Sequence, residues 1–273
     1  MNISTKLFVF AALLLLPALS VCGATVASAE GPAGGTLRFT VLYDNYVFLD
    51  GTRADWGFAC LIEGAEKTIL FDTGTKPEVL LHNAQALKVD LKKIELIVLS
   101  HEHGDHTGGL QAVLAEKPKA TVYFPASFPA EFGRKAREAG AETRAVDKPI
   151  EICRNVHLTG EMGDRIKEMS LVLDTPEGLV VVTGCSHPGI VDILKRAKEI
   201  RNKPIRLAFG GFHLGNTPDA EVQKIIAAFQ DLEVERCGAT HCTGDRPIAL
   251  FKAAFGDRYV PIGTGRVIEV PGF

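Results

Sequence analysis

The chain alternates between short apolar segments with a two-residue period and longer segments in which apolar residues recur with helical spacing. In its first half, the pattern predicts strands at residues 37–42, 57–62 and 68–71, followed by a helix over 77–87 with Pro77 in its first turn. Glu63-Gly64-Ala65-Glu66 reads as the turn between two of these strands. Residues 94–99 form a nearly continuous apolar run, which is typical of a buried strand.

The second half repeats this alternation. It predicts strands at 121–124, 171–173, 179–182, 205–209 and 260–270, and helices at 129–139, 188–200 and 220–229. Two series of strands, each accompanied by helices, indicate two sheets packed face to face with helices outside. Periodicity alone supports only an α/β fold.

The first thirty residues differ from the rest. Lys6 precedes an apolar run from Leu7 to Leu19, and Ala27-Ser28-Ala29 offers a cleavage site. We therefore predict a signal peptide over 1–29, a flexible leader over 30–35 and one domain over 36–273, in a protein exported to the periplasm. The apolar run is short for a membrane span, which needs about 20 residues. Lipidation at Cys22 is the alternative, and would anchor the chain to a membrane.

The composition of the chain narrows the classes of partner that the protein is expected to bind. Hydrophobic residues make up 46% of the chain, charged residues 23%, and the formal net charge is −3. Without a basic excess to neutralise phosphates, a nucleic-acid partner is not expected, and we predict a small-molecule substrate. Five of the six cysteines would remain after cleavage, and an odd number does not form a complete disulfide framework. The sequence does not indicate an oligomeric state.

A dense histidine segment follows the predicted buried strand: Ser100-His101-Glu102-His103-Gly104-Asp105-His106-Thr107. His101 and His103 are two residues apart, so in extended chain both imidazoles face the same way. Gly104 permits a sharp turn, after which Asp105 and His106 point to a second position close by. Imidazole and carboxylate ligands suit zinc, and also iron or manganese.

This H-x-H-x-D-H pattern after a buried strand resembles the signature of the metallo-β-lactamase superfamily. The resemblance implies an α/β fold of four layers, the αββα metallo-β-lactamase sandwich, with the metal site at one edge. Leu70-Phe71-Asp72-Thr73-Gly74 resembles the first motif of the superfamily, whose aspartate supports the site. Three later segments are similar to the branch of 7,8-dihydropterin-6-yl-methyl-4-(β-D-ribofuranosyl)aminobenzene 5'-phosphate synthase-like metal-dependent hydrolases: Gly184-Cys185-Ser186-His187-Pro188, Gly210-Gly211-Phe212-His213 and Thr240-His241-Cys242.

The resemblance also implies roles for individual residues. His101, His103 and His187 would hold one divalent ion, while Asp105, His106 and His241 would hold a second. Cys185 stands where many members have a bridging aspartate; it is either a thiolate ligand of the second ion or a small buried residue.

The sequence also suggests roles for the remaining histidines and for Cys242. His213 is expected to contact substrate, donate a proton or form a hydrogen bond in the core, and Gly210-Gly211 favours substrate contact. Cys242 is expected to be structural. His82 on a predicted helix and His157 on a predicted strand are expected to lie outside the site.

These residues predict a hydrolase in which two divalent ions activate water against an ester, phosphoester or amide bond, with Asp105 and His213 as catalytic residues. The chain has no G-x-S-x-G or H-E-x-x-H motif that would supply a different nucleophile or metal site. Three alternatives remain: a mononuclear-iron sulfur dioxygenase or other redox enzyme on the same fold, a class B β-lactamase, and a metal-binding protein without catalysis.

Overall fold

The computed structural model describes residues 35–117 and 119–272, together with Met1. The predicted signal peptide, the lipidation site Cys22 and the leader up to residue 34 lie outside the described residues. The described residues from 35 to 272 form one compact unit. Among the described residues, no helix combines the length and the apolar character that a membrane crossing needs.

The first sheet has seven strands in the order β13-β1-β2-β3-β4-β5-β6. Its strands are β1 (Thr36–Tyr43), β2 (Ala59–Glu63), β3 (Ile69–Phe71), β4 (Leu96–Val98), β5 (Thr121–Pro125), β6 (Glu142–Val146) and β13 (Val267–Pro271). Strands β3 to β6 run parallel, whereas β13, β1, β2 and β3 pair antiparallel. The short strands β3 and β4 are fully buried, as expected from their apolar runs.

The second sheet has six strands in the order β12-β11-β10-β9-β8-β7. They are β7 (Ile150–Cys153), β8 (Val156–Leu158), β9 (Leu171–Thr175), β10 (Gly178–Thr183), β11 (Ile205–Gly211) and β12 (Val234–Thr240). Strands β10, β11 and β12 run parallel. Every residue of β10 is buried, because this strand lies in the centre of the sheet with layers on both faces.

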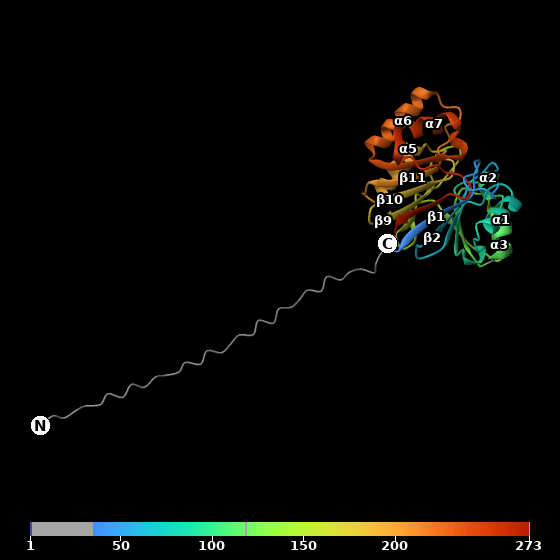
Figure 1. The fold of residues 1–273 in the computed structure, drawn as a ribbon. Helices are drawn as coiled ribbons and strands as arrows, with labels where there is room; N and C mark the ends of the chain where they lie inside the picture. Colours follow the sequence, from blue (N-terminus) through green and yellow to red (C-terminus); the bar gives the residue numbers. More distant parts are fainter. Residues whose placement is uncertain (2–34, 118, 273) are drawn as a thin grey trace. The chain divides into compact units, whose positions relative to one another are not determined.

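Helices cover the outer face of each sheet, giving four layers (Figure 1). The first sheet carries α1 (Pro77–Ala86), the short α2 (Gly104–Thr107), α3 (Leu110–Glu116) and α4 (Ala130–Glu138); the second carries α5 (Ile190–Ile200), α6 (Asp219–Asp231) and α7 (Asp245–Phe255). One apolar cluster fills the space between the sheets, including Phe39, Phe71 and Phe209. Two further clusters join each sheet to its helices. This arrangement confirms the predicted αββα sandwich.

The structure corrects the bounds of one predicted strand, that over 260–270. Residues 260–266 are irregular, and only Val267–Pro271 forms the last strand, because Pro261, Gly263 and Gly265 interrupt the pattern. The helices over 77–87, 129–139, 188–200 and 220–229 are confirmed within a few residues.

The topology brings the segments that carry the candidate metal ligands to one edge of the sandwich. The chain enters α2 after β4, leaves β10 at Thr183 and leaves β12 at Thr240. These strands belong to the parallel parts of the two facing sheets. The segments 100–106, 184–188 and 241–243 therefore meet at their carboxyl ends.

Candidate metal centre

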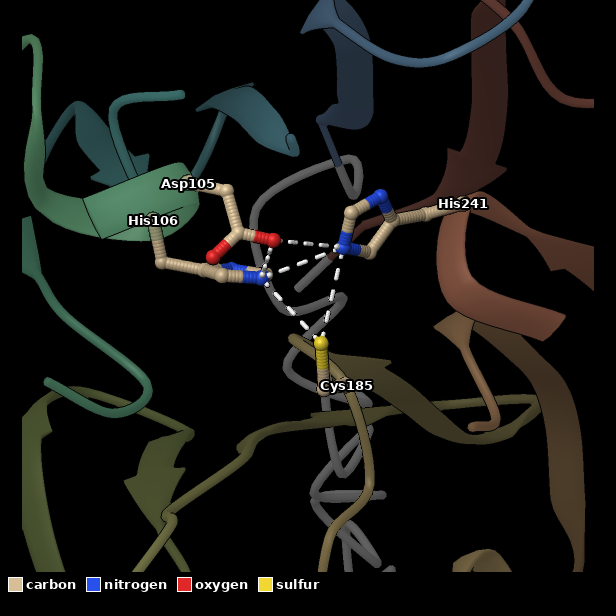
Figure 2. A group of neighbouring side chains, drawn as sticks. All are labelled: Asp105, His106, Cys185 and His241. Atoms are coloured by element: carbon tan, nitrogen blue, oxygen red, sulfur yellow. Dashed lines mark hydrogen bonds and ion pairs between the residues drawn. The ribbon is translucent and has the colours of Figure 1, made fainter. Parts of the chain in front are cut away.

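Four side chains from three separate segments converge at this edge: Asp105, His106, Cys185 and His241 (Figure 2). Their potential ligand atoms all lie within 4.8 Å of one another. The Sγ atom of Cys185 lies 3.2 Å from His106 Nε2 and 3.5 Å from His241 Nε2. Asp105 Oδ2 lies 3.5 Å from His106 Nε2 and 3.4 Å from His241 Nε2. The sulfur of Cys185 therefore faces the same point as the other three groups.

A second group adjoins the first and consists of His101, His103 and His187. The Nε2 atom of His101 lies 3.1 Å from Nδ1 of His103. The ring centroid of His187 lies 4.9 Å from those of both His101 and His103. The two groups are contiguous, because the rings of His101 and His106 are 4.2 Å apart. These are the groups that the family resemblance implied, and Cys185, whose role the sequence leaves open, lies with the second group.

Hydrogen bonds fix which nitrogen of His106 and His241 carries a proton. His106 Nδ1 lies 2.7 Å from the Asp72 carboxylate, which can only accept, so Nδ1 must donate. His241 Nδ1 lies 2.9 Å from Asn45 Oδ1, an oxygen that also accepts the N–H of Gly57. In the neutral rings, both Nε2 atoms therefore point lone pairs toward the centre.

His101 is oriented in the same way. The Ser100 hydroxyl donates to Asp72 Oδ2 at 2.7 Å, so its oxygen accepts the proton of His101 Nδ1 at 2.9 Å. Asp72 also accepts the Ser100 N–H at 2.7 Å. One buried carboxylate thus sets the orientation of a histidine in each group, as the resemblance implied for Asp72.

Charge around the centre favours a cation. Burial lowers the pKa of His106, yet Asp72 and Asp105 raise it to about 10. Burial also opposes ionisation of Asp105, but hydrogen bonds from His106 and His241 hold its pKa well below the usual range. Burial lowers the pKa of His187 to about 4, which keeps this ring neutral. The Asp105 side of the centre requires positive charge, while the His187 side offers neutral ligands.

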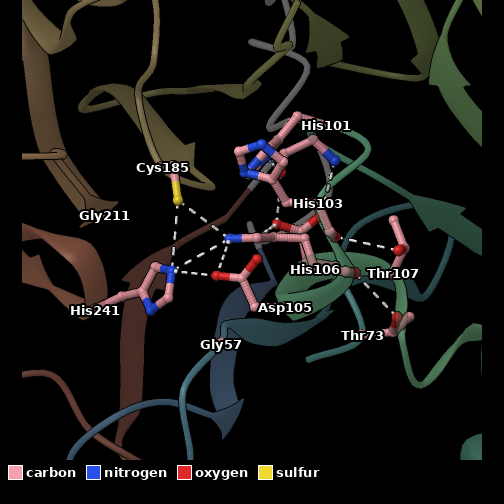
Figure 3. Close-up of polar contacts among 12 residues, drawn as sticks. Gly57, Thr73, His101, His103, Asp105, His106, Thr107, Cys185, Gly211 and His241 are labelled. Atoms are coloured by element: carbon pink, nitrogen blue, oxygen red, sulfur yellow. Dashed lines mark hydrogen bonds and ion pairs between the residues drawn. The ribbon is translucent and has the colours of Figure 1, made fainter. Parts of the chain in front are cut away.

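Hydrogen bonds to backbone carbonyls hold the segment of candidate ligands in place (Figure 3). The Thr73 hydroxyl donates to the carbonyl of His106 at 3.0 Å, and that of Thr107 donates to the carbonyl of His103 at 3.1 Å. Gly57 approaches so closely that a Cβ atom there would lie 2.5 Å from the Asp105 carbonyl oxygen. Asp105 is therefore positioned from both sides of the short helix α2.

Glu168 supports the loop that carries Cys185 and His187. It is buried, and its carboxylate accepts the backbone N–H groups of Cys185, Ser186 and His187 at 2.9, 2.8 and 2.8 Å. Burial raises its pKa to about 7, against these hydrogen bonds. Glu168 could not be predicted from the sequence, because an isolated glutamate carries no local signal of a partner seventeen residues away.

Asn45 and Asp44 were also missed. Asn45 orients His241, and the buried Asp44 accepts the hydroxyl of Thr240 at 2.8 and 2.9 Å. Burial raises the pKa of Asp44 to about 7. Both residues follow β1, which lies far from β12 in the sequence. Their hydrogen bonds hold Thr240 and His241 in place at the end of β12.

His213 and Cys242 lie beside the centre. The ring of His213 is 4.3 Å from that of His187, and its donor atom lies within 4.8 Å of those of Cys185 and His187. His213 is exposed, so it can meet a substrate. Cys242 is buried, its thiol donates to the carbonyl of Cys185 at 3.5 Å, and it belongs to none of the donor groups among the described residues. This geometry agrees with a structural role for Cys242.

Two other histidines lie outside the site, as expected. His82 is in α1, with its Nε2 3.0 Å from the carbonyl of Gly51. His157 is buried in β8. Phe212 is buried among Phe229 and Phe251, whereas Trp56 is exposed beside His241.

The donor set fits divalent metal ions. His187 Nε2 is buried and has no hydrogen-bond partner among the described residues, although it faces His101 and His103. Two inward lone pairs only 3.2 Å apart, on His106 and His241, likewise need a cation or proton between them. Imidazole, thiolate and carboxylate together match zinc, and also iron.

Comparisons with known proteins agree with this geometry. A sequence model of the metallo-beta-lactamase superfamily matches residues 57–184. The 7,8-dihydropterin-6-methyl-4-(beta-D-ribofuranosyl)-aminobenzene-5'-phosphate synthase of Methanocaldococcus jannaschii is 29% identical over 262 residues, which cover 78% of this chain and 89% of that protein.

Solved structures extend the match over the whole domain. Tm1679, described as a metal-dependent hydrolase of the beta-lactamase superfamily, is 30% identical with a TM-score of 0.72, covering 86% of this chain and 99% of that one. YhfI from Bacillus subtilis, a metallo-beta-lactamase fold protein, has a TM-score of 0.66 at 15% identity, covers 86% and 100%, and shows the fold alone. The chain therefore belongs to the metallo-β-lactamase superfamily, and its relatives place it beside the dihydropterin-ribofuranosyl-aminobenzene phosphate synthase branch.

Proposed function

We propose that the protein is a hydrolase that uses two divalent metal ions, zinc in the first instance, to cleave an ester, phosphoester or amide bond of a small molecule. The observation that carries the proposal is the convergence of two contiguous donor groups in which His101, His106 and His241 turn unprotonated nitrogens inward. His101, His103 and His187 would hold one ion; Asp105, His106, Cys185 and His241 would hold the other. When bound, such ions supply Lewis acidity and lower the pKa of water that attacks the substrate.

Asp105 has the position and charge to orient the attacking water. Its side chain is only 17% exposed, its pKa is held low, and one oxygen already contacts His106 and His241. The carboxylate can accept a hydrogen bond from the attacking water and orient it toward the scissile bond. Asp105 lies in α2, and its carbonyl accepts the N–H of Phe58 at 3.3 Å beside the closely packed Gly57, so this orientation is set before the substrate binds.

His213 has the position of a substrate contact. It is exposed, stands against His187 and follows β11, so it faces the outside of the donor groups. An imidazole there can donate a proton or a hydrogen bond to a leaving oxygen or nitrogen. Gly210 and Gly211 come shortly before His213 in the chain, and neighbouring backbone lies too close to both glycines for a Cβ atom.

A cavity of about 620 Å³ lies on the His187 side of the centre and is lined by Gly163, Asp164, Arg165, Ile166, His187 and Pro188. Arg165 is exposed and forms no ion pair or side-chain hydrogen bond within the described part of the chain. A guanidinium in this position favours an anionic group on the substrate, such as a phosphate. The relative from M. jannaschii carries a phosphate in the name of its product.

Metal analysis of the purified protein tests the proposal. We expect two ions per chain in wild type, one or none in His103→Ala, and a partial loss in Cys185→Ala if the thiolate is a ligand. His82→Ala serves as the control, because this imidazole lies in α1, outside both donor groups. Absence of metal from the wild type, even after reconstitution with zinc or iron, would contradict the proposal.

A substrate screen of phosphodiesters, phosphomonoesters, lactones and nitrocefin then distinguishes the bond types. Hydrolysis of nitrocefin would place the protein among the β-lactamases. One iron per chain without hydrolysis would favour a sulfur dioxygenase. Bound metal with neither activity nor an effect of Asp105→Asn would favour a metal-binding protein without catalysis.

A further inference from the structure

Trp56 is the most exposed large apolar side chain in residues 35–272, with 57% of its surface accessible. It is also the single tryptophan of the chain. Its ring lies beside His241, with 5.0 Å between the ring centroids and an interplanar angle of 54°. An exposed tryptophan leaves a large apolar surface in water, which is unfavourable unless something covers it.

The exposure of Trp56 is not a consequence of a loose chain. Its carbonyl accepts the hydroxyl of Thr75, and the N–H of Gly57 donates to Asn45 at 3.1 Å. The preceding Asp55 pairs with Lys76 at 3.0 Å and accepts the hydroxyl of Tyr43 at 2.9 Å. Residues on both sides are thus tied to the body of the domain, so the indole is presented at a fixed place.

Other exposed apolar residues of the same segment differ from Trp56. Phe48, 43% exposed, lies under the guanidinium of Arg266, which is 4.7 Å from its ring centroid. Val47 bridges to Thr264, and the backbone N–H of Leu49 donates to the carbonyl of Thr264. These three residues face the end of the first sheet. Trp56 alone among them contacts a residue of the donor groups.

Neighbouring aromatic rings form a continuous series of contacts along the site. His187 contacts His101, His101 contacts His106, His106 contacts His241, and His241 contacts Trp56. The cavity with Arg165 opens at the His187 end of this series. Trp56 stands at the opposite end, past the group of Asp105, His106, Cys185 and His241.

We infer that Trp56 is a specificity-determining residue, on whose exposed face a planar aromatic or heteroaromatic group of the substrate stacks, next to His241. This inference rests on the proposed function and names the substrate class for the same site. The planar group lies on the His241 side of the scissile bond, and the anionic group lies on the His187 side, beside Arg165. A flat ring fits because its face can meet the indole while its edge reaches the bond over Asp105.

Benzoate and cyclohexanecarboxylate are suitable probes, since both carry one carboxylate and differ in the planarity of the ring. Hydrophobic burial alone favours the cyclohexane ring, whereas stacking favours benzoate. With zinc-loaded wild type, the emission of the single tryptophan reports directly on Trp56. We expect benzoate to protect Trp56 from acrylamide quenching, and to bind about fivefold to tenfold more tightly than cyclohexanecarboxylate by calorimetry.

Variants of Trp56 separate stacking on the substrate from a purely structural role of the indole. In Trp56→Leu, calorimetry should give equal affinities for both probes with zinc content unchanged, and Trp56→Phe should restore part of the preference. Equal affinities in wild type, or probes that bind without protecting Trp56, would overturn the inference. Loss of zinc in Trp56→Leu would overturn it as well, because the indole would then hold His241 in place. Failure of the proposed function would appear separately, as absence of zinc from wild type.

Discussion

The Nε2 atoms of His106 and His241 lie 3.2 Å apart, and neither ring can turn its proton toward the other. His106 must donate through Nδ1 to Asp72, and His241 must donate through Nδ1 to Asn45. The two residues come from segments 135 positions apart, yet each is oriented by a separate partner, the buried Asp72 or the half-buried Asn45. Two facing lone pairs at this distance need a positive charge between them: a proton, which the raised pKa of His106 favours in the metal-free centre, or a metal ion, whose binding would then add to the stability of the fold.

Zinc should therefore raise the melting temperature of the protein. A ligand that binds only the folded state at a free concentration a hundred times its Kd stabilises by about 2.7 kcal/mol. We expect this gain in wild type and in His82→Ala, and a much smaller gain in His241→Ala, measured by calorimetric melting with and without zinc. An equal gain in His241→Ala would show that zinc acts elsewhere.

Glu168→Gln should loosen the loop that carries Cys185 and His187. The glutamine amide can no longer accept all three backbone N–H groups, and its own NH₂ would face a donor. A buried unsatisfied group costs about 1–3 kcal/mol, measurable by denaturant unfolding of the metal-free protein. Glu161→Gln is the matched control, because Glu161 also accepts a backbone N–H, that of Ser127, but at an exposed position. Equal losses in the two variants would contradict a special role for Glu168.

The central candidate ligands could be predicted to lie together because their signal is contiguous. His101, His103, Asp105 and His106 follow an apolar strand within six residues, so the local chain already places them together. His187 and His241 depend on tertiary structure and were assigned through the family resemblance. Glu168 and Asn45 could not be found, because their importance arises from backbone and ring atoms that only the folded chain brings near.

The missed strands have a physical explanation too. In β6 only Val146 is buried, and its residues do not alternate between apolar and polar; β7 has only four residues, and none of them is fully buried. Strand β12 carries Glu235 and Arg236 near its start. Edge strands gain stability from hydrogen bonding along the sheet and need little apolar surface, which removes the signal on which pattern reading depends.

Export through the predicted signal peptide can be tested by mass spectrometry of the protein recovered from the periplasm of an expressing bacterium. The mature chain is expected to begin at Glu30, and replacement of Ala29 by Leu should block cleavage, since the position before the cut accepts only small residues. Cys22→Ser should leave the mature mass unchanged. A chain that begins at Cys22 with the mass of attached lipid would instead establish the lipoprotein alternative.

Gly57→Ala should both destabilise the protein and weaken metal binding. The new Cβ would lie 2.5 Å from the carbonyl oxygen of Asp105, at a glycine with φ of +145°. We expect a loss of about 1–3 kcal/mol in unfolding free energy. Gly51→Ala is the matched control: its φ is +88°, but nothing lies within 4 Å of the added atom. Only Gly57→Ala should reduce the zinc affinity; an equal reduction in both variants would indicate a general effect of backbone strain.

Arg165→Ala should weaken the binding of inorganic phosphate to the zinc-loaded protein. A hydrogen bond to a charged group contributes about 1.5–3 kcal/mol, so the affinity should fall at least about tenfold in a calorimetric titration. Arg154→Ala, at an exposed arginine in the turn between β7 and β8, controls for the loss of one positive charge. Zinc content should be unchanged in both variants, because neither side chain is a metal ligand. If Arg154→Ala weakened phosphate binding as strongly, the effect would be one of net charge. If neither variant did, the anion would bind to the metal ions alone, and the cavity beside His187 would have another purpose.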